Sequence, residues 1–271
     1  MKRMKRTSRR KLGVMMIVQK FGGVAMKDKQ SRKLCIEHIK NGLKEHQNVI
    51  VVVSAIGRGS DPYSTDSLLQ LTDAFSSSKA ASDLAASCGE LIAAAVISAE
   101  LEQEGVPNRV LHGIQAGIWT AGNFGDGTIV DIDPAMITDS LSQTGCVVIP
   151  GFQGINENGQ VMTIGRGGSD LTAIALGAAL RVSHVEFFKD VPGVMTGDPR
   201  TNENTTKLSD MAINELLPLL ETDRPIIQKR AALYAMQKAI PLYIRGIATL
   251  EEGTWIYPAV TDRKSNKNSI H

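Results

Sequence analysis

The chain has 271 residues, of which 42% are hydrophobic, enough for one large α/β domain or two closely packed lobes. Its formal net charge of +2 is uneven, because residues 1–11 carry seven Lys or Arg and no acid, which leaves 23 basic against 28 acidic residues elsewhere. A mildly acidic body without a basic stripe excludes nucleic-acid binding, apart from whatever the tail contributes.

The two ends of the chain and its cysteines indicate in which cellular compartment the protein works. Residues 1–13 lack the pattern of a signal peptide, so we expect a basic disordered tail there and a polar tail at 261–271. Cys35, Cys88 and Cys146 are widely spaced, which indicates that the protein works in a reducing compartment and has no zinc site. No apolar run approaches the ~20 residues of a membrane span. We therefore expect a cytoplasmic protein without a membrane segment.

Short runs rich in β-branched residues predict the strands, and several are apolar throughout, as in strands buried on both faces. The expected strands are 13–21, 48–56, 108–113, 145–152, 184–191 and 240–246. The expected helices are 31–46, 81–105, 169–180 and 228–239, with loops at 57–66 and 121–128, the latter a candidate small hairpin. Strands that alternate with helices predict an α/β fold with a parallel-type sheet between helices.

Four stretches are candidates for chemistry, and the first is QKFGG at 19–23. A strand ends at Lys20 and opens into Gly22 and Gly23. Glycine lets backbone N–H groups approach an anion closely, and lysine adds a mobile charge. The alternative is an ordinary solvated strand end, since the GxxxxGK[ST] phosphate loop is absent.

The second stretch is TIGRGGSDLT at 163–172, ahead of an Ala-rich helix. Its glycines suit a backbone that wraps a phosphate at a helix N-terminus, and Arg166 suits a carboxylate or a phosphate. Asp170 has three candidate roles: it caps the helix, as Ser169 also can, it orients the lysine of the first stretch, or it holds a metal. A flexible turn with a helix cap is the plain alternative.

The third stretch, KDVPGVMTGDPR at 189–200, follows a strand and contains two turns, as nucleotide-binding loops and ordinary loops both do. Its polar candidates are Asp190, Asp198 and Arg200. The fourth stretch, SCGE at 87–90, places Glu90 in an apolar helix, either on a surface face or as a carboxylate that receives an amino group. No GxSxG elbow and no histidine spacing supports nucleophilic or zinc chemistry.

Taken in this order, the four stretches resemble the aspartokinase family within the amino-acid kinase superfamily. The matching text is QKFGG, VVVSAIGRGSDPYSTDSLL, SCGE, QAGIWT, PGFQGINENGQVMTIGRGGSDLTA and FFKDVPGVMTGDPR, and its wording looks most like the Gram-positive bacterial enzymes. The resemblance implies a three-layer αβα sandwich with a central, mostly parallel eight-stranded sheet. It also implies a substrate lobe at about 14–150 and a nucleotide lobe at about 151–260.

The implied reaction is transfer of the γ-phosphoryl group of ATP, with Mg²⁺, to the side-chain carboxylate of L-aspartate. The product is 4-phospho-L-aspartate, on the route to lysine, threonine and methionine. Lys20 would stabilise the transferring group, and Asp170 would organise the lysines. The implied nucleotide-binding residues are Gly22, Gly23, Gly168, Lys189, Asp190, Met195, Asp198 and Arg200. The implied aspartate-binding residues are Ser54, Thr65, Glu90, Arg166 and Ser169.

Within that set, Arg166 would hold the α-carboxylate of aspartate, Glu90 would take its ammonium group, and Gly22, Gly23 and Gly168 would supply backbone donors. No residue is expected to ligate a metal directly. The family usually dimerises, so a homodimer is expected, with neither nucleic acid nor membrane as a partner.

The chain departs from the family at three places. KFGGTS becomes KFGGVAM, so Val24 and Ala25 replace two hydroxyls, and a strand-end threonine becomes Lys189. A GAKV-HPR-like segment becomes DRPIIQKR, with Pro225 at the lysine position. The residues that remain as candidates for the missing charge are Arg224, Lys229 and Lys189.

Three hypotheses therefore stay open. The first is an aspartokinase-type catalytic domain without the paired ACT regulatory domains that usually follow it. The second is an amino-acid kinase with a shifted carboxylate acceptor. The third is a catalytically weak paralogue that regulates or scaffolds a partner.

Overall fold

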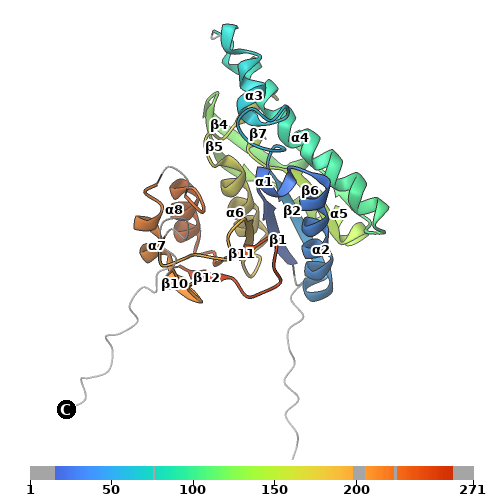
Figure 1. The fold of residues 1–271 in the computed structure, drawn as a ribbon. Helices are drawn as coiled ribbons and strands as arrows, with labels where there is room; N and C mark the ends of the chain where they lie inside the picture. The colour runs from blue at the N-terminus through green and yellow to red at the C-terminus, as the bar shows by residue number, and fades with distance from the viewer. Residues whose placement is uncertain (1–15, 76, 198–204, 223–224, 259–271) are drawn as a thin grey trace, which may run out of the picture.

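The structure is a computed structural model that describes residues 16–75, 77–197, 205–222 and 225–258 (Figure 1). The predicted tails at 1–13 and 261–271 lie outside the described residues, as do Asp198, Arg200 and Arg224.

The main sheet has eight strands in the order β10-β12-β11-β9-β1-β2-β6-β3. Among the described strands, β11 and β12 pair antiparallel and the other neighbours in this sheet pair parallel. The predicted mostly parallel, eight-stranded sheet is therefore confirmed. The strands are β1 (Met16–Phe21), β2 (Asn48–Val53), β3 (Arg109–Val110), β6 (Cys146–Pro150), β9 (Val185–Lys189), β10 (Asp210–Ala212), β11 (Leu242–Gly246) and β12 (Thr254–Tyr257).

A second sheet of four strands has the order β5-β4-β7-β8. The hairpin predicted at 121–128 is confirmed as its β4–β5 turn, but the rest of this sheet was not predicted. Two of its strands have three residues each, too few for a periodic pattern to show. The strands are β4 (Ile118–Asn123), β5 (Asp126–Ile132), β7 (Gln153–Ile155) and β8 (Val161–Thr163).

Helices cover both faces of the main sheet, and the alternation of side chains along β1 and β2 sorts the core into two clusters (Figure 1). Ile17 and Val51 pack with α2 and α4, whereas Val18 and Val52 pack with α6. These strands are buried on both faces, as their continuous apolar sequences predict. The helices are α1 (Gly23–Met26), α2 (Lys29–His46), α3 (Thr65–Gln70), α4 (Lys79–Gln103), α5 (Ala135–Thr144), α6 (Gly168–Leu180), α7 (Ile213–Leu219) and α8 (Lys229–Lys238), with 3-10 turns η1 (Asp73–Phe75) and η2 (Gly113–Ala116).

Helix α4 is long and apolar enough, by length and composition, to cross a membrane, so the expectation that no apolar segment approaches such a span is wrong in that respect. Half of its most apolar window is buried inside the fold, and the helix packs against β6 and β8. Ala93, Ile97 and Leu101 are fully buried in the core. Its apolar sequence is therefore accounted for by its place in the core.

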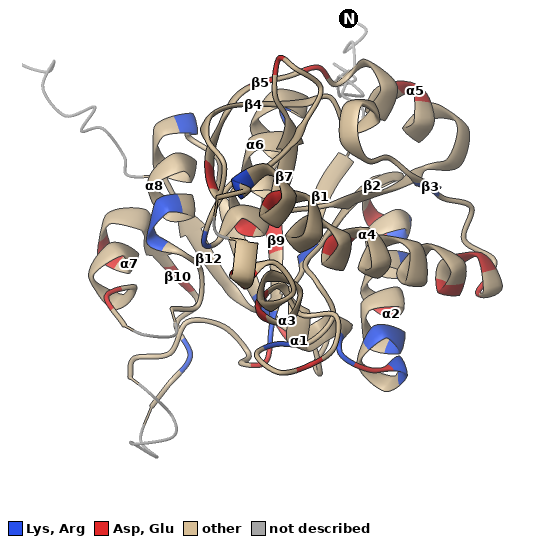
Figure 2. Cartoon of the chain, turned by 90° about the horizontal axis from the view of Figure 1, so that it is seen from above, with Lys and Arg blue, Asp and Glu red and all other residues tan. Residues whose placement is uncertain are grey.

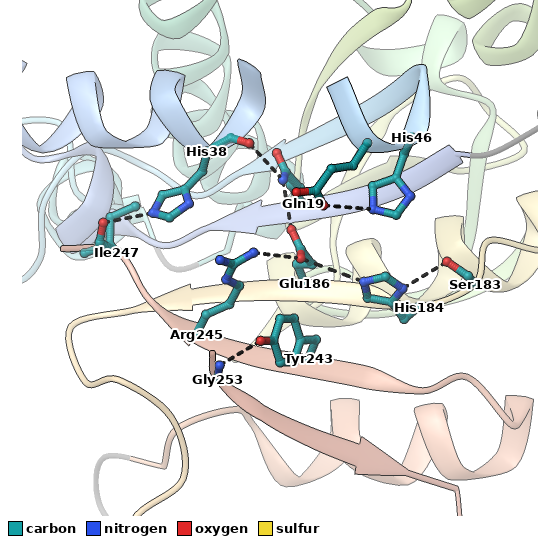
Figure 3. A network of polar contacts seen from close by, with 11 residues as sticks. Gln19, His38, His46, Ser183, His184, Glu186, Tyr243, Arg245, Ile247 and Gly253 are labelled. Carbon is teal, nitrogen blue, oxygen red and sulfur yellow. Dashed lines mark hydrogen bonds and ion pairs between the residues drawn. The ribbon is translucent and has the colours of Figure 1, made fainter. Parts of the chain in front are cut away.

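A buried polar network ties α2 to strands β1, β9 and β11 (Figure 3). The amide of Gln19 donates to Glu186 Oε2 at 2.9 Å and to the carbonyl of His38 at 3.2 Å. Arg245 Nη1 donates to Glu186 Oε1 at 3.2 Å, and His38 Nε2 lies 3.0 Å from the carbonyl of Ile247. The network thus fixes the positions of three neighbouring strands just before their carboxyl ends.

Glu186 is the centre of this network. Burial opposes its charge, but the His184 ring 3.8 Å away, a hydrogen bond from Gln19 and the positive charge of Arg245 together hold the pKa of Glu186 below its usual value. The folded state therefore favours the ionised carboxylate, which contributes stability above the unfolded-state pKa and loses it as the pH falls through the folded-state pKa.

We predict that Glu186→Gln lowers the free energy of unfolding by about 2–4 kcal/mol at pH 7, because it leaves the Arg245 charge poorly paired. Urea denaturation measures this change, and the difference from wild type should shrink as the pH falls below 4. Glu104→Gln is the control, because Glu104 pairs with Lys40 on the surface and its loss should change little. Equal effects of the two substitutions would contradict the prediction.

Candidate active site

A cavity of about 470 Å³ lies at the carboxyl ends of β1, β2 and β9, beside the start of α6. Seen from above, acidic and basic segments lie together between α4, α6 and β9 (Figure 2). Parallel strands present their carboxyl ends at the same edge of the sheet, which is where ligands bind in open α/β folds. The residues predicted for the site that line this cavity are Lys20, Gly22, Gly23, Ser54, Thr65, Glu90, Arg166, Gly168, Ser169, Asp170, Lys189 and Asp190.

Asp170 lies between two lysines at the floor of the cavity. Its Oδ1 is 2.5 Å from Lys20 Nζ, and its Oδ2 is 3.9 Å from Lys189 Nζ. Burial opposes ionisation of this carboxyl, yet the charges of Lys189 and Lys20 hold the pKa of Asp170 below its usual value. Burial also lowers the pKa of Lys189 to about 8, although Asp170 counteracts it.

The prediction that Ser169 or Asp170 caps α6 is wrong. The helix begins at Gly168, its N-cap is Gly167, and no side chain caps it. Asp170 is therefore already the third residue of the helix, and its carboxylate faces the lysines. Because Asp170 is occupied by two ammonium groups, it does not fit the alternative role of a metal ligand.

The turn before α6 depends on glycine. Gly165 and Gly167 have φ angles of +79° and +78°. A Cβ atom at Gly167 would overlap the side chain of Gln228, and one at Gly165 would lie 2.7 Å from Asp126 Oδ1. The backbone N–H of Gly168 donates to the carbonyl of Gly165 at 2.9 Å. The N–H group of Gly168 is thus already used by the turn, although Gly168 lines the cavity as predicted.

The turn after β1 is equally tight. A Cβ atom at Gly23 would overlap the carbonyl oxygen of Gly57. In addition, the backbone N–H of Gly57 donates to the carbonyl of Gly23 at 3.0 Å. The two turns that follow β1 and β2 thus pack directly against each other. Val24 and Ala25, which come next, line the cavity as apolar residues.

Glu90 enters the cavity from α4 and is only 2% exposed. The alternative that it lies on a surface face of the helix is therefore wrong. One carboxylate oxygen accepts from the backbone N–H of Ala55 at 3.1 Å, and the other has no partner among the described residues. Burial raises the pKa of Glu90 to about 8. A buried carboxylate with one unused oxygen is suited to receive a cationic group of a ligand.

The remaining candidates are placed as follows. Arg166 and Asp190 are exposed where they border the cavity. Met195 is not part of the cavity lining and forms an isolated β-bridge with Lys207.

Pro225, at the position of the family's lysine, lines the cavity. Lys229 does not replace the missing charge, because it pairs with Glu221 on the surface at 2.7 Å. Lys189 is the candidate that the structure places in the site.

Sequence reasoning missed two residues that shape the site. Asp83 lies in α4 seven residues before Glu90, on the same buried face, and also lines the cavity. The seven-residue spacing between Asp83 and Glu90, two helical turns, is the sequence signal that could have identified it. Arg230 of α8 donates to the carbonyl of Ile164 at 2.8 Å and holds the turn before α6 from the other side. No local sequence pattern predicts that contact, since Arg230 and Ile164 are 66 positions apart.

The described residues contain no group of three or more His, Cys, Asp or Glu side chains arranged to hold a metal ion. Mg²⁺ is usually held by one or two carboxylates together with substrate phosphates. Besides Asp170, the carboxylates that line the cavity are Asp66, Asp83, Glu90 and Asp190, and Asp190 directly follows Lys189 in the chain. Asp190 is the residue that would hold such an ion if a nucleotide brought it to the site.

Comparison with known proteins assigns the class. The model of the amino acid kinase family matches residues 15–246, and the chain belongs to this family. Within it, the sequence is similar to aspartokinases. It is 42% identical over 253 residues to Aspartokinase 1 of Bacillus subtilis (strain 168), a match that covers 93% of this chain and 62% of that protein.

Solved structures agree on the fold. An aspartate kinase from Synechocystis matches with a TM-score of 0.78 at 31% identity, over 92% of this chain and 40% of that chain. E. coli aspartokinase III in complex with aspartate and ADP matches with a TM-score of 0.71 at 21% identity, over 91% of this chain and 65% of that chain. The chain spans about 60% of the length of the curated relatives that it matches.

We predict that Gly167→Ala lowers the free energy of unfolding by about 2–3 kcal/mol, because it combines a positive φ with a clash against Gln228. Gly159→Ala is the matched control: its φ is +74°, but nothing lies within 4 Å of the added Cβ. It should cost only about 1 kcal/mol. Urea denaturation of both variants measures the difference, and equal losses would show that the contact with Gln228 is unimportant.

Proposed function

We propose that this chain transfers the γ-phosphoryl group of ATP to the side-chain carboxylate of L-aspartate, which gives 4-phospho-L-aspartate and ADP. The observation that carries the proposal is the placement of Lys20, Asp170 and Lys189 in one cavity with Glu90, whose second oxygen is unused. The similarity to aspartokinases supports the choice of acceptor, and the ligands of the E. coli enzyme, aspartate and ADP, are the corresponding pair.

In this reaction, a carboxylate oxygen of aspartate forms a bond to the γ-phosphorus, and the bond from that phosphorus to the β–γ bridging oxygen breaks. The electron pair leaves with ADP. The carboxylate carries no proton at neutral pH, so no general base is required. Catalysis then depends on position and charge neutralisation, which Lys20 and Lys189 supply beside the transferring group.

Asp170 keeps the two ammonium groups in place. At 2.5 Å from Lys20 Nζ, its carboxylate restricts where that charge lies before any ligand binds. Charges that are fixed in advance need little reorganisation during the reaction, which is the main advantage of such a site over water. Asp170 is therefore the residue that preorganises the cations.

The acceptor is bound through its α-ammonium group and its α-carboxylate group. Glu90 receives the ammonium group on its unused oxygen, and Arg166 binds the α-carboxylate with its planar guanidinium. The hydroxyls of Ser54, Thr65 and Ser169 line the same cavity and complete the set of polar contacts. The side-chain carboxylate of aspartate is then the group left to face Lys20.

The turn at Gly22 and Gly23 and the side chain of Lys189 would hold the phosphates of ATP, and Asp190 would hold the Mg²⁺ that neutralises part of their charge. In this proposal residues 14–150 form the acceptor lobe and residues 151–260 the nucleotide lobe, with Met195, Asp198 and Arg200 assigned to the nucleotide. We further propose a cytoplasmic homodimer that acts in lysine biosynthesis.

A second candidate is the same transfer to a different carboxylate. Val24, Ala25 and Pro225 line the cavity with apolar surface. An acceptor with additional apolar atoms would contact this surface favourably, whereas aspartate has only one methylene group to place against it. This observation favours an acceptor that is larger than aspartate.

We predict that the full chain, given ATP and Mg²⁺, forms an acyl phosphate from aspartate that hydroxylamine traps as the hydroxamate. Lys20→Met should lower the turnover number by at least about 100-fold, since it removes a charge at the transferring group. Lys27→Met, at an exposed lysine, is the control and should retain activity.

Glutamate and N-acetylglutamate, tested in parallel, separate the candidates. Turnover with one of these and not with aspartate supports a shifted acceptor. No turnover with any of them, while ATP still binds, would contradict both kinase proposals and support a regulatory paralogue.

We also predict a pH dependence that comes from Glu90. Its pKa of about 8 means that the carboxyl is mainly protonated in the free enzyme at pH 6, so ammonium binding must displace a proton. At saturating ATP, KM for aspartate should fall about tenfold per pH unit from pH 6 towards 8 and then level. Glu90→Gln should remove the slope and keep KM for aspartate high. A flat profile in the wild-type chain would exclude this role for Glu90.

A further inference from the structure

Asp83 is a buried carboxylate in the cavity to which the proposed reaction gives no role. It lies near the start of α4, is 3% exposed and shares its helix face with Ser87 and Glu90. Seven residues along a helix are two turns, or about 10 Å. Asp83 and Glu90 thus mark two separate levels of the same cavity wall.

One oxygen of Asp83 holds two distant parts of the chain. Asp83 Oδ2 accepts from the backbone N–H of Gly125 at 3.0 Å and from that of Thr163 at 2.7 Å. Gly125 lies in the β4–β5 turn, and Thr163 is the last residue of β8. Hydrogen bonds to an ionised acceptor are about twice as strong as neutral ones, so this contact is a firm attachment.

The attachment leads directly to Arg166, three residues after Thr163. The β4–β5 turn packs against the start of this segment, since a Cβ atom at Gly165 would lie 3.2 Å from the carbonyl oxygen of Gly125. From the opposite side, Arg230 donates to Asp126 Oδ1 at 2.9 Å and to the carbonyl of Ile164 at 2.8 Å. The segment that carries Arg166 is therefore held between α4 and α8.

We propose that Asp83 is a positioning residue that sets the distance between Glu90 and Arg166 and thereby selects the length of the acceptor. The inference rests on the proposed function, in which these two residues bind the ammonium and carboxylate groups of the acceptor. Glu90 and Asp83 belong to one rigid helix, and Asp83 ties the Arg166 segment to that helix. A looser tie lets Arg166 move relative to Glu90, which weakens binding of a short acceptor and admits longer ones.

The variant Asp83→Asn tests this with little change of shape. Asparagine keeps one acceptor oxygen, which is enough for both contacts, but it carries no charge, so the two hydrogen bonds from Gly125 and Thr163 become weaker neutral ones. The fold should survive, because the side chain of Gln153 also joins the second sheet to α4, at 3.1 Å from the carbonyl of Ser87. Asp83→Glu, which keeps the charge on a longer side chain, is the second variant and should give intermediate values.

In Asp83→Asn, we expect KM for aspartate to rise about tenfold, with KM for ATP unchanged within about twofold, since two charge-assisted hydrogen bonds are weakened on the acceptor side alone. The preference for aspartate over glutamate, as a ratio of kcat/KM values, should fall by a similar factor. Ser87→Ala is the control on the same helix face: its hydroxyl bonds only within α4, to the carbonyl of Leu84, and all of these values should stay at wild-type level.

A purely structural role for Asp83 would raise both KM values together, and that result would overturn the proposal. An unchanged KM for aspartate would overturn it equally. Amide hydrogen exchange at Gly125 and Thr163 tests the tie independently of turnover: exchange should be faster in Asp83→Asn and unchanged in Ser87→Ala. If the wild-type chain phosphorylates no acceptor, the proposed function fails. The exchange result then still decides whether Asp83 holds the segment, and unchanged exchange would refute it.

Discussion

A single buried carboxylate, Asp170, organises the charged part of this molecule. Its position follows from the fold: α6 starts between the carboxyl ends of β1 and β9, and the third residue of α6 faces the last charged side chains of both strands. Burial penalises an isolated charge, so the enclosed ammonium groups of Lys20 and Lys189 depend on the nearby carboxylate for compensation. The ion pairs therefore depend on the helix start, and the helix start depends on the glycine turn before it.

That turn explains why so much of the site is made of glycine. Two turns that meet at the cavity approach another backbone or side chain too closely for a Cβ atom, at Gly23 after β1 and at Gly165 and Gly167 before α6. Tight packing of turns brings Lys20, Asp170 and Glu90 within one small cavity although they come from distant parts of the chain. Behind them, the network around Glu186 fixes the strands on which the lysines lie (Figure 3). Close packing in front and paired charges behind thus produce one rigid site.

The sequence was sufficient for six of the eight strands of the main sheet, because several of them are continuous apolar runs. It was insufficient for β10 and β12 of that sheet and for β7 and β8 of the second sheet, which have only three or four residues each and are too short for a period to show. It also did not predict α5 and α7. For the site, resemblance identified Lys20, Glu90 and Asp170 by their motifs. It did not show that the turn already uses the N–H group of Gly168. It also failed at Asp83, whose two partners are fixed by tertiary contacts 42 and 80 residues away.

Lys189 gives the cavity a second cation, although Pro225 is apolar. Both line the cavity, and the ammonium group of Lys189 lies near the same carboxylate as Lys20. Its pKa of about 8 means that a part of the empty molecules holds this amine uncharged near neutral pH. If a nucleotide binds beside Lys189 as proposed, its phosphates raise the pKa of this amine and binding draws in a proton. The opposite would hold at Glu90, where the proposed ammonium ligand lowers a raised pKa and releases a proton. Under the proposed function, the empty cavity therefore carries less charge than the loaded one, because each ligand favours the charged form of the group that binds it.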